Sequence, residues 1–169
     1  MQTTVKLYSY AYSEAKTYVF AAMFIVGNIL LPQLCHLVPQ GGVTWLPIYF
    51  FTLVGSYKYG WKVGLLTALL SPAVNSLLCA MPPVSALPAV TIKSVFLALA
   101  AGYAASRSRS VSVLLLAAVV LSYQMAGTLA EWACAGSLHV AMQDFRIGLP
   151  GMFMQVFGGY LVINFLIRK

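Results

Sequence analysis

One lysine stands inside a long run of hydrocarbon side chains, which makes it the first residue to ask about chemistry. Lys93 lies five residues after Pro88, within the apolar segment 88–106. A charge near the middle of a membrane costs about 2.5–3.5 kcal/mol on insertion scales, so membrane proteins keep such residues for function. A buried ammonium needs an anionic partner. We expect this partner to be an anionic group of a small molecule, the carboxylate of Glu131, or both.

Other polar residues recur at helical spacing in neighbouring apolar segments. Gln124, Thr128 and Glu131 stand at positions i, i+4 and i+7, which places them on one face of a helix. Asn75 and Gln155 also lie inside apolar segments, and such polar groups point into a helix bundle because lipid cannot bond them. We expect all five to contact a ligand or to form interhelical hydrogen bonds, which are worth about 0.6 kcal/mol each on average.

The segments that carry these residues indicate an integral membrane protein. Of the 169 residues, 61% are hydrophobic and 8% are charged, whereas soluble domains carry about 25% charged residues. A membrane-spanning helix needs about 20 apolar residues. The sequence predicts an all-α bundle of six such helices in one domain, 1–169, at 16–34, 43–58, 62–80, 88–106, 111–134 and 147–167. The second is short and contains Pro47, so we expect it to be tilted or broken.

The positions of the basic residues predict the orientation of the bundle. Lys and Arg concentrate on the cytoplasmic side of a membrane. With the N-terminus inside, only Arg146 falls in an outer loop, and eight basic residues fall on the inner side: Lys6, Lys16, Lys58, Lys62, Arg107, Arg109, Arg168 and Lys169. Both termini are then cytoplasmic. Lys93, Asn75 and Glu131 come to one level in the outer half of the bundle, where we expect a pocket open to the outside.

The net charge of +7 does not indicate a nucleic-acid partner, because the basic residues lie between the apolar segments, as topology signals in a lipid bilayer do. Aromatic residues gather near the expected outer surface, at Trp45, Tyr49 and Trp132. They fit an interfacial belt, and they also fit stacking on a ligand ring. Gly41 and Gly42 precede a helix start, and glycine readily provides left-handed backbone and hinge freedom. They fit a loop that closes over the pocket, or a plain turn.

Signals for catalysis and for metals are weak. Cysteines and histidines occur near the expected outer face, at Cys35, Cys79, Cys134, His36 and His139. They lack CxxC and HxxxH spacing, so no metal site is predicted. The catalytic motifs of metalloproteases, serine hydrolases and P-loop ATPases do not occur. We therefore expect no enzyme and no cofactor. An enzyme acting on lipid or isoprenoid substrates, with Glu131, Asp144 or His139 as catalytic groups, remains an alternative, as does a cell-shape scaffold of the MreD type.

Three features of 41–105 occur together. A glycine-bearing outer loop leads to a Leu-Pro pair, at Gly41, Gly42, Leu46 and Pro47. Glycines surround an inner turn, at Gly55, Gly60 and Gly64. The fourth segment begins with a proline and a basic residue and ends in small residues, at Pro88, Lys93, Gly102 and Ala105. In these features the stretch resembles the substrate-binding S component of energy-coupling factor (ECF) transporters, the bacterial vitamin-uptake family.

This resemblance implies a function. S components are six-helix bundles of the bacterial plasma membrane that bind a vitamin or related micronutrient near the outer surface. The loop between the first two helices typically closes the site. Transport is driven by an energising module, which comprises a transmembrane scaffold subunit and two ABC-type ATPases. Docking to that module often uses an Ala-x-x-x-Ala pattern in the first helix, and Ala11 and Ala15 have this spacing.

Overall fold

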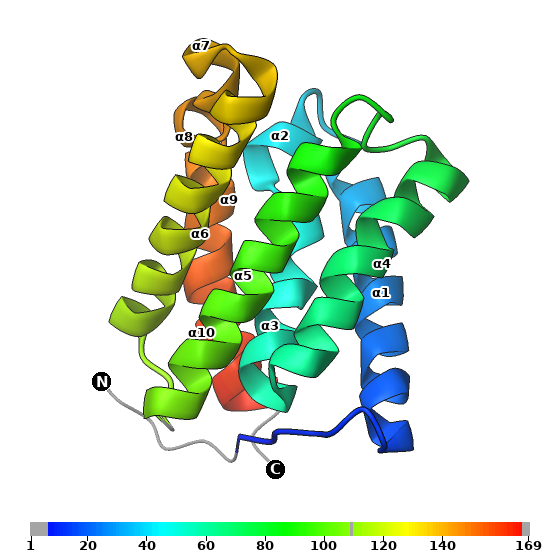
Figure 1. The fold of residues 1–169 in the computed structure, drawn as a ribbon, viewed down its shortest axis with the longest axis vertical. Coiled ribbons are helices and arrows are strands. Elements are labelled where there is room, and N and C mark those ends of the chain that lie inside the picture. Colours follow the sequence, from blue (N-terminus) through cyan, green and yellow to red (C-terminus); the bar gives the residue numbers. More distant parts are fainter. Residues whose placement is uncertain (1–6, 109, 167–169) are drawn as a thin grey trace.

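The fold is a bundle of helices that run alternately up and down (Figure 1). The computed structural model describes residues 7–108 and 110–166, and only the backbone of 134, 135, 140 and 166. Within this part of the chain there are helices and no β-strand. The long helices are α1 (Ala15–Cys35), α4 (Trp61–Cys79), α5 (Leu87–Ser108) and α6 (Val113–Ala135). The all-helical class predicted from the sequence is therefore confirmed.

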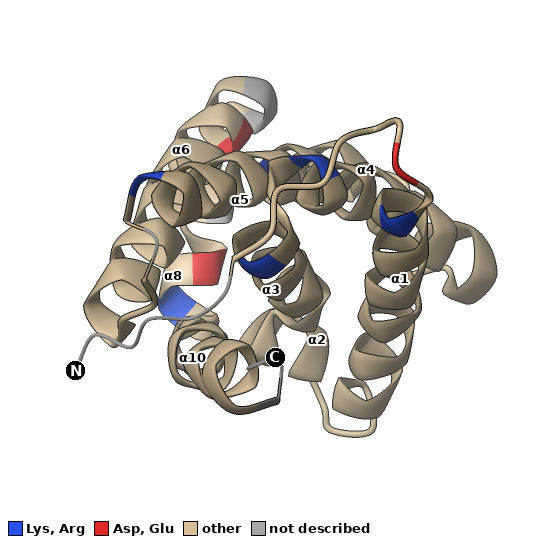
Figure 2. Cartoon of the chain, turned by 90° about the horizontal axis from the view of Figure 1, so that it is seen from below, with Lys and Arg blue, Asp and Glu red and all other residues tan. Residues whose placement is uncertain are grey.

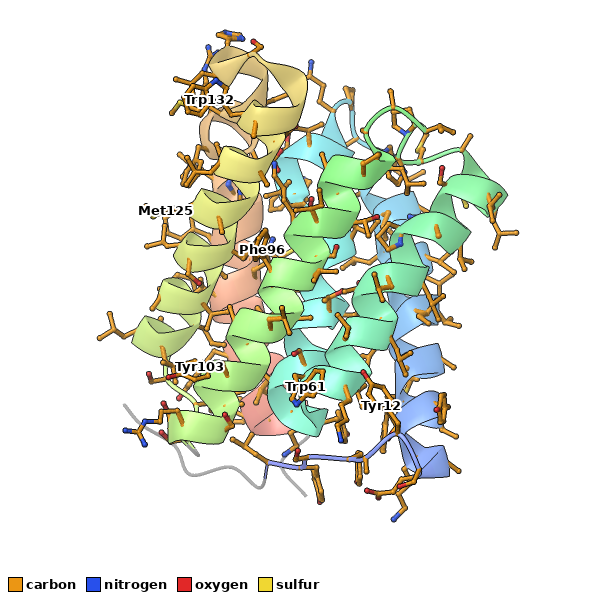
Figure 3. The ribbon with its side chains drawn as sticks, in the orientation of Figure 1. Tyr12, Trp61, Phe96, Tyr103, Met125 and Trp132 are labelled. Carbon is orange, nitrogen blue, oxygen red and sulfur yellow. The ribbon has the colours of Figure 1, made fainter. Side chains whose placement is uncertain are left out.

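Four helices are long and apolar enough to cross a membrane: α1, α4, α5 and residues 113–133 of α6. Their outward surfaces are apolar. Phe96 and Met125, for example, are 39% and 61% exposed and lie on α5 and α6 (Figure 3). A water-soluble bundle would cover its exterior with charge, so these helices indicate a membrane protein.

The predicted second span is broken near its start. It consists of α2 (Gly41–Trp45), a short 3-10 turn (Pro47–Tyr49) and α3 (Phe50–Tyr59). Leu46 separates the first two pieces with a φ of 46°, which a helix does not allow, and Pro47 follows it. The break that Pro47 predicts is therefore present, and it turns the chain at the end of the bundle where α2 lies.

The chain after α6 forms short helices and then returns along the bundle. These helices are α7 (Leu138–Ala141), α8 (Gln143–Ile147) and α9 (Leu149–Phe153). The return continues through a π-helical turn (Met154–Gly158), α10 (Gly159–Leu161) and a second π-helical turn (Val162–Leu166). The apolar helix Leu149–Phe165 lies within the predicted sixth span but is shorter than the four long helices.

Helix α5 lies between α4 and α6 and also packs against α3 (Figure 2). The hydroxyl of Ser56 on α3 donates to the carbonyl of Ala98 on α5. On α6, Gly127 permits a close approach, since a Cβ atom there would collide with the stem of Lys93. The bundle thus packs the stem of Lys93 directly against the backbone of α6 at Gly127.

A second set of buried polar contacts joins α1, α3 and α4. The side-chain amide of Asn28 on α1 donates to the hydroxyls of Thr52 on α3, at 3.0 Å, and Ser71 on α4, at 3.2 Å. Its oxygen accepts from the backbone N–H of Phe51 at 3.2 Å. We call these four residues the Asn28 node. Both N–H groups of the Asn28 amide and its carbonyl oxygen therefore have a protein partner.

Basic residues of the described chain gather at the end of the bundle where α1 begins (Figure 2). Lys16, Lys62 and Arg107 lie at the ends of α1, α4 and α5 there, whereas Arg146 lies at the opposite end, on α8. Lys58 belongs to the last turn of α3, where it is buried, and its Nζ lies 5.7 Å from the ring centre of Tyr8. The other basic residues of the predicted inner face lie outside the described residues: Lys6, Arg109, Arg168 and Lys169.

Candidate functional site

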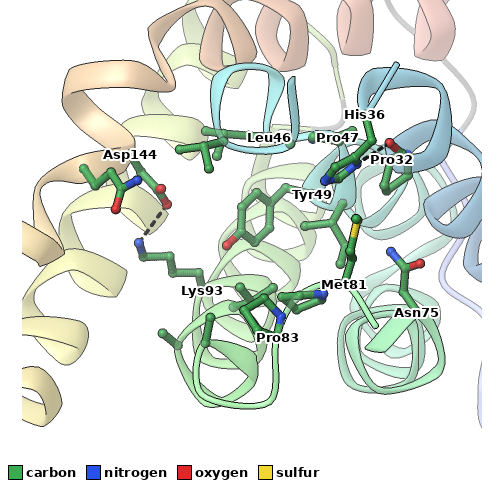
Figure 4. Close-up of a pocket in the computed structure, with 18 of the residues that line it drawn as sticks. Pro32, His36, Leu46, Pro47, Tyr49, Asn75, Met81, Pro83, Lys93 and Asp144 are labelled. Carbon is green, nitrogen blue, oxygen red and sulfur yellow. Dashed lines mark hydrogen bonds and ion pairs between the residues drawn. The ribbon is translucent and has the colours of Figure 1, made fainter. Parts of the chain in front are cut away.

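A cavity of about 370 Å³ opens at the end of the bundle where α2 and α8 lie (Figure 4). Its walls come from α1, the α2–α3 turn, α4, the loop before α5, and helices α5, α6 and α8. Much of the lining is apolar, including Met81, Pro83 and the ring of Tyr49, whose hydroxyl is polar. The polar lining residues are His36, Gln40, Asn75, Lys93, Glu131, Gln143 and Asp144. The cavity therefore combines apolar walls with a few convergent polar groups, which is typical of small-molecule sites.

Lys93 forms two ion pairs at one side of this cavity. Its Nζ lies 2.5 Å from Oε2 of Glu131 on α6 and 2.7 Å from Oδ2 of Asp144 on α8. Lys93 is 3% exposed, and the two carboxylate side chains are 19% and 16% exposed. The expectation that Lys93 meets Glu131 is confirmed, and a second carboxylate joins them. We call these three residues the charged triad.

Asp144 was not among the binding residues expected from the sequence. It reaches Lys93 because the chain after α6 folds back over the end of the bundle. In that fold, Gly151 of α9 lies directly against the backbone of Trp45 on α2, with no room for a Cβ atom. One signal was present in the sequence. The chain has three acidic residues in total, so a buried lysine has few choices of partner.

Across the cavity from the triad lies Asn75 of α4 (Figure 4). It is 1% exposed, and its Oδ1 has no hydrogen-bond partner among the residues that the structure describes. Tyr49, which is 2% exposed, stands between Asn75 and the triad in this view. Both residues were expected at the site. A buried amide oxygen without a partner is costly, and a donor in the cavity would satisfy it after the Asn75 amide rotates.

His36 adds a third polar point. Its Nδ1 lies 2.6 Å from the carbonyl oxygen of Pro32, four residues earlier in α1. A carbonyl only accepts, so Nδ1 carries a proton and, in the neutral ring, Nε2 is an acceptor. The sequence placed His36 near the expected outer face without assigning it a role, and the structure places it in the cavity wall.

Five other residues expected at the site do not line the cavity. Trp45 and Trp132 are 39% and 46% exposed, and Figure 3 shows Trp132 on the outside of the bundle near α7. Gln124, Thr128 and Gln155 point inward and are buried, away from the cavity.

These three buried residues differ in their bonding. Gln155 accepts a hydrogen bond from the hydroxyl of Tyr123 at 2.9 Å. The side-chain amide of Gln124 and the hydroxyl of Thr128 have no partner within the described part of the chain. The interhelical role is therefore visible for Gln155 alone.

The glycines of the expected closing loop lie in a helix. Gly41 and Gly42 form the first turn of α2, and neither has a positive φ. The left-handed residues are Gln40 and Leu46, on either side of α2, with φ of 58° and 46°. The left-handed freedom of glycine is therefore not used at these two positions. These glycines instead permit close packing: a Cβ on Gly42, which lines the cavity, would lie 2.7 Å from the ring of His36.

The expected docking pair does not form a helical face. Ala11 precedes α1, where its N–H donates to Oε1 of Glu14 at 2.9 Å and its carbonyl accepts from the hydroxyl of Thr17 at 2.6 Å. Ala15 is the first residue of α1. Because only one of the two is helical, a spacing of four does not align Ala11 and Ala15, and the pattern loses its geometric basis.

Within the described residues, no three His, Cys, Asp or Glu side chains lie close enough together to hold a metal ion. Cys35 and Cys79 are free thiols, and the side chain of Cys134 lies outside the described part. His139, one of the catalytic alternatives, is exposed, with its Nε2 2.5 Å from Nη1 of Arg146.

Comparison of the chain with protein-family models, with curated proteins and with solved structures finds no match in any of the three. The resemblance to S components therefore rests on the residues quoted above, and function has to be argued from the cavity.

Proposed function

We propose that this chain is a membrane-embedded protein that binds a small molecule, and that it serves as the substrate-binding subunit of an ECF-type importer. The observation that carries the proposal is the 370 Å³ cavity with the charged triad on one side and the unsatisfied Asn75 on the other. Ligand sites commonly measure about 300–1,000 Å³. A structural ion pair alone needs no adjoining cavity, and a ligand site does.

In this proposal all six helical passes cross the bacterial plasma membrane, with both termini in the cytoplasm. The distribution of charge supports it, since Lys16, Lys62 and Arg107 lie at the end opposite the cavity. Basic residues favour the cytoplasmic side. The cavity then opens to the outside, where an imported nutrient arrives.

The closing element in this proposal is α2. It is a five-residue helix between two left-handed residues, Gln40 and Leu46, and Gln40, Gly42 and Leu46 all line the cavity. Left-handed backbone is strained for residues other than glycine, and such strain is concentrated at ligand clamps. Energy for transport comes from a partner module with ATPases, as the resemblance to S components implies.

Equilibrium dialysis tests the binding proposal. The purified protein in lipid nanodiscs is dialysed against low-mass metabolites extracted from its own cells, and mass spectrometry identifies what it retains. We expect a retained compound that saturates at one per chain. A variant with a filled cavity, Ala89→Trp, is expected to retain none, because Ala89 lines the cavity. Equal retention by both proteins would place the binding outside this cavity, and retention by neither would favour a scaffold; either result contradicts the proposal.

Co-purification tests the transport proposal separately. The tagged chain is expressed with the scaffold subunit and the two ATPases of an energising module from the same cells. We expect a stable complex and uptake of the retained compound that depends on ATP hydrolysis. Binding of the compound without such a complex would support a receptor and contradict the assignment as an importer subunit.

A further inference from the structure

We propose that the cavity takes a small organic cation, with its charged nitrogen against Glu131 and Asp144 and a hydrogen-bond donor at its other end against Asn75. The proposal rests on the proposed binding function and names the chemical class of the ligand. Three observations carry it: the balance of charge, the free oxygens of the triad, and the unsatisfied amide across the cavity.

The charges of the triad do not cancel. Lys93 contributes one positive charge, and Glu131 and Asp144 contribute two negative charges. Lys93 is the one Lys or Arg among the described residues that line the cavity. Arg146, on the same short helix as Asp144, is exposed and contacts His139 instead. With His36 neutral, the lining carries a net charge of −1, in a setting where an uncompensated charge is costly.

The free oxygens are placed to receive a cation. Lys93 engages Oε2 of Glu131 and Oδ2 of Asp144, so the second oxygen of each carboxylate is left for another donor. A carboxylate accepts up to about four hydrogen bonds. A ligand ammonium bonded there brings the charge of the site to zero. A ligand anion placed on Lys93 raises the excess to −2, or forces one carboxylate to leave.

This balance differs from the one that the sequence indicated. An anionic ligand was expected there because the lysine was weighed against Glu131 alone. Asp144 supplies the second negative charge, and with it Lys93 pairs with two protein carboxylates, at 2.5 and 2.7 Å. In this arrangement Lys93 positions the two carboxylates, and the carboxylates contact the ligand.

An organic cation fits better than a metal ion. Calcium takes six to eight oxygen ligands, and magnesium requires near-octahedral coordination. The triad offers two carboxylates, and Lys93 already occupies the space between them. An ammonium group or a protonated ring nitrogen requires only a few hydrogen bonds and tolerates such a site.

The rest of the cavity defines the other end of the ligand. The Oδ1 of Asn75 is buried and has no partner among the described residues, so a ligand donor such as an amide or amino N–H would satisfy it once the Asn75 amide turns its oxygen toward the cavity. Between the two ends lie the ring of Tyr49 and the apolar side chains of Met81 and Pro83 (Figure 4). A flat, mostly apolar body suits these walls. At 370 Å³, the cavity is near the lower end of the usual range for ligand sites.

Three probes of one shape test this class of ligand: para-(aminomethyl)benzamide, para-(hydroxymethyl)benzamide and para-carboxybenzamide. Each carries an amide donor for Asn75, and they differ in having a cationic, neutral or anionic end. Binding to the whole protein in nanodiscs is measured by titration calorimetry. We expect the cation to bind at least about tenfold more tightly than the alcohol, and the anion to bind most weakly.

Charge variants then locate the contact. Asp144→Asn and Glu131→Gln are each expected to weaken the cation about tenfold while leaving the alcohol within about twofold. The matched control is Glu14→Gln, which changes the third acid of the chain. Glu14 lies at the opposite end of the bundle, where its Oε1 accepts from Ala11.

Ion-exchange fractions of the cell extract separate the two possible failures. Retention of a compound from the cation-exchange fraction, together with the probe order above, supports the proposal. Tightest binding of para-carboxybenzamide, or retention only from the anion-exchange or neutral fraction, overturns the cationic class and keeps the binding function. Absence of binding by every probe and every fraction overturns both.

Discussion

The Asn28 node and the cavity beside the charged triad are two buried polar sites. The hydrogen-bonding groups of the buried asparagine are satisfied at the node, and its amide oxygen is left open in the cavity, which we call the pocket below. At the node, the Asn28 amide makes three bonds, to Thr52, Ser71 and Phe51, and is 0% exposed. In the pocket, Asn75 is 1% exposed and its Oδ1 has no partner among the described residues. The same side chain is therefore satisfied by protein in one place and left open in the other.

The difference separates residues that hold the fold from residues that receive a ligand. A closed set of hydrogen bonds joins α1, α3 and α4 and needs nothing else. An open acceptor beside a cavity is tolerated because a ligand or water can complete it. Burial alone does not distinguish the two sites. What distinguishes them is a hydrogen-bonding atom that has no protein partner and lies on a residue that lines a cavity.

The largest effect is expected from removing the charge that both carboxylates share. Lys93→Met leaves Glu131 and Asp144 close together and unpaired. We expect a loss of about 3–5 kcal/mol in the free energy of unfolding, as for a broken buried ion pair. Denaturation in detergent micelles measures it, with Lys16→Met as the exposed control.

Neutralising the acids provides the matching rescue. Adding Glu131→Gln and Asp144→Asn to Lys93→Met is expected to restore most of the lost stability without restoring binding. A Lys93→Met protein as stable as the wild type would show that the triad is not a coupled unit.

The next effect compares one substitution at the two sites. Asn28→Leu strands the hydroxyls of Thr52 and Ser71 and the N–H of Phe51, so we expect a loss of about 2–4 kcal/mol of stability. Ligand affinity in the folded fraction is expected to stay unchanged. Stability is read by denaturation and affinity by calorimetry.

The same change in the pocket is expected to give the reverse result. Asn75→Leu removes an oxygen without a protein partner, so stability is expected to change by less than about 1 kcal/mol, while ligand affinity falls about tenfold. The comparison fails if the two variants lose stability equally, since the pocket asparagine would then serve the fold.

A smaller effect is expected from moving Lys93 without changing it. Gly127→Val places a Cβ atom against the Lys93 stem, and overpacking of this kind costs about 1–3 kcal/mol. We expect weaker ligand binding as well, because the triad shifts. Ala133→Val, at an exposed site of the same helix, controls for the β-branched side chain. Equal stability and equal ligand affinity of the two valine variants would show that the close packing of α6 at Gly127 does not position Lys93.

The last prediction changes stability least and fixes the side on which the pocket opens. Single cysteines at Ser85 and Ser108, both exposed, are introduced into a chain without its native cysteines. An impermeant maleimide added to intact cells is expected to label position 85 and not position 108. Gly60 is a poor site for such a cysteine, because its φ is 100°. Labelling of position 108 from outside would reverse the topology.

The all-helical class and the four long apolar helices were predictable, because hydropathy and length determine where long helices lie in a membrane protein. The break at Pro47 was predictable because a proline interrupts a helix. The chain from α7 to α9 was not, since its short helices pack against other elements, α7 against α6, and α8 and α9 against α2, and are too short to show periodicity.

The pocket was predictable only in part. Lys93, Glu131 and Asn75 are found there because charge and amide groups inside apolar helices must face the interior. Asp144 was missed because it reaches the site only through the folding of α8. Trp45 was misplaced because an aromatic residue near a membrane surface fits a belt as well as a site. Asn28 was overlooked, although it too lies in an apolar segment.

The most direct test of the central claim is a structure of the protein in nanodiscs, determined after incubation with the metabolite fraction that it retains. We predict non-protein density that spans the cavity from Asn75 to the free oxygens of Glu131 and Asp144, and no such density in the Ala89→Trp variant. Density at a different place, with the cavity between Asn75 and Lys93 empty or closed by side chains, would contradict the claim that this pocket receives the ligand.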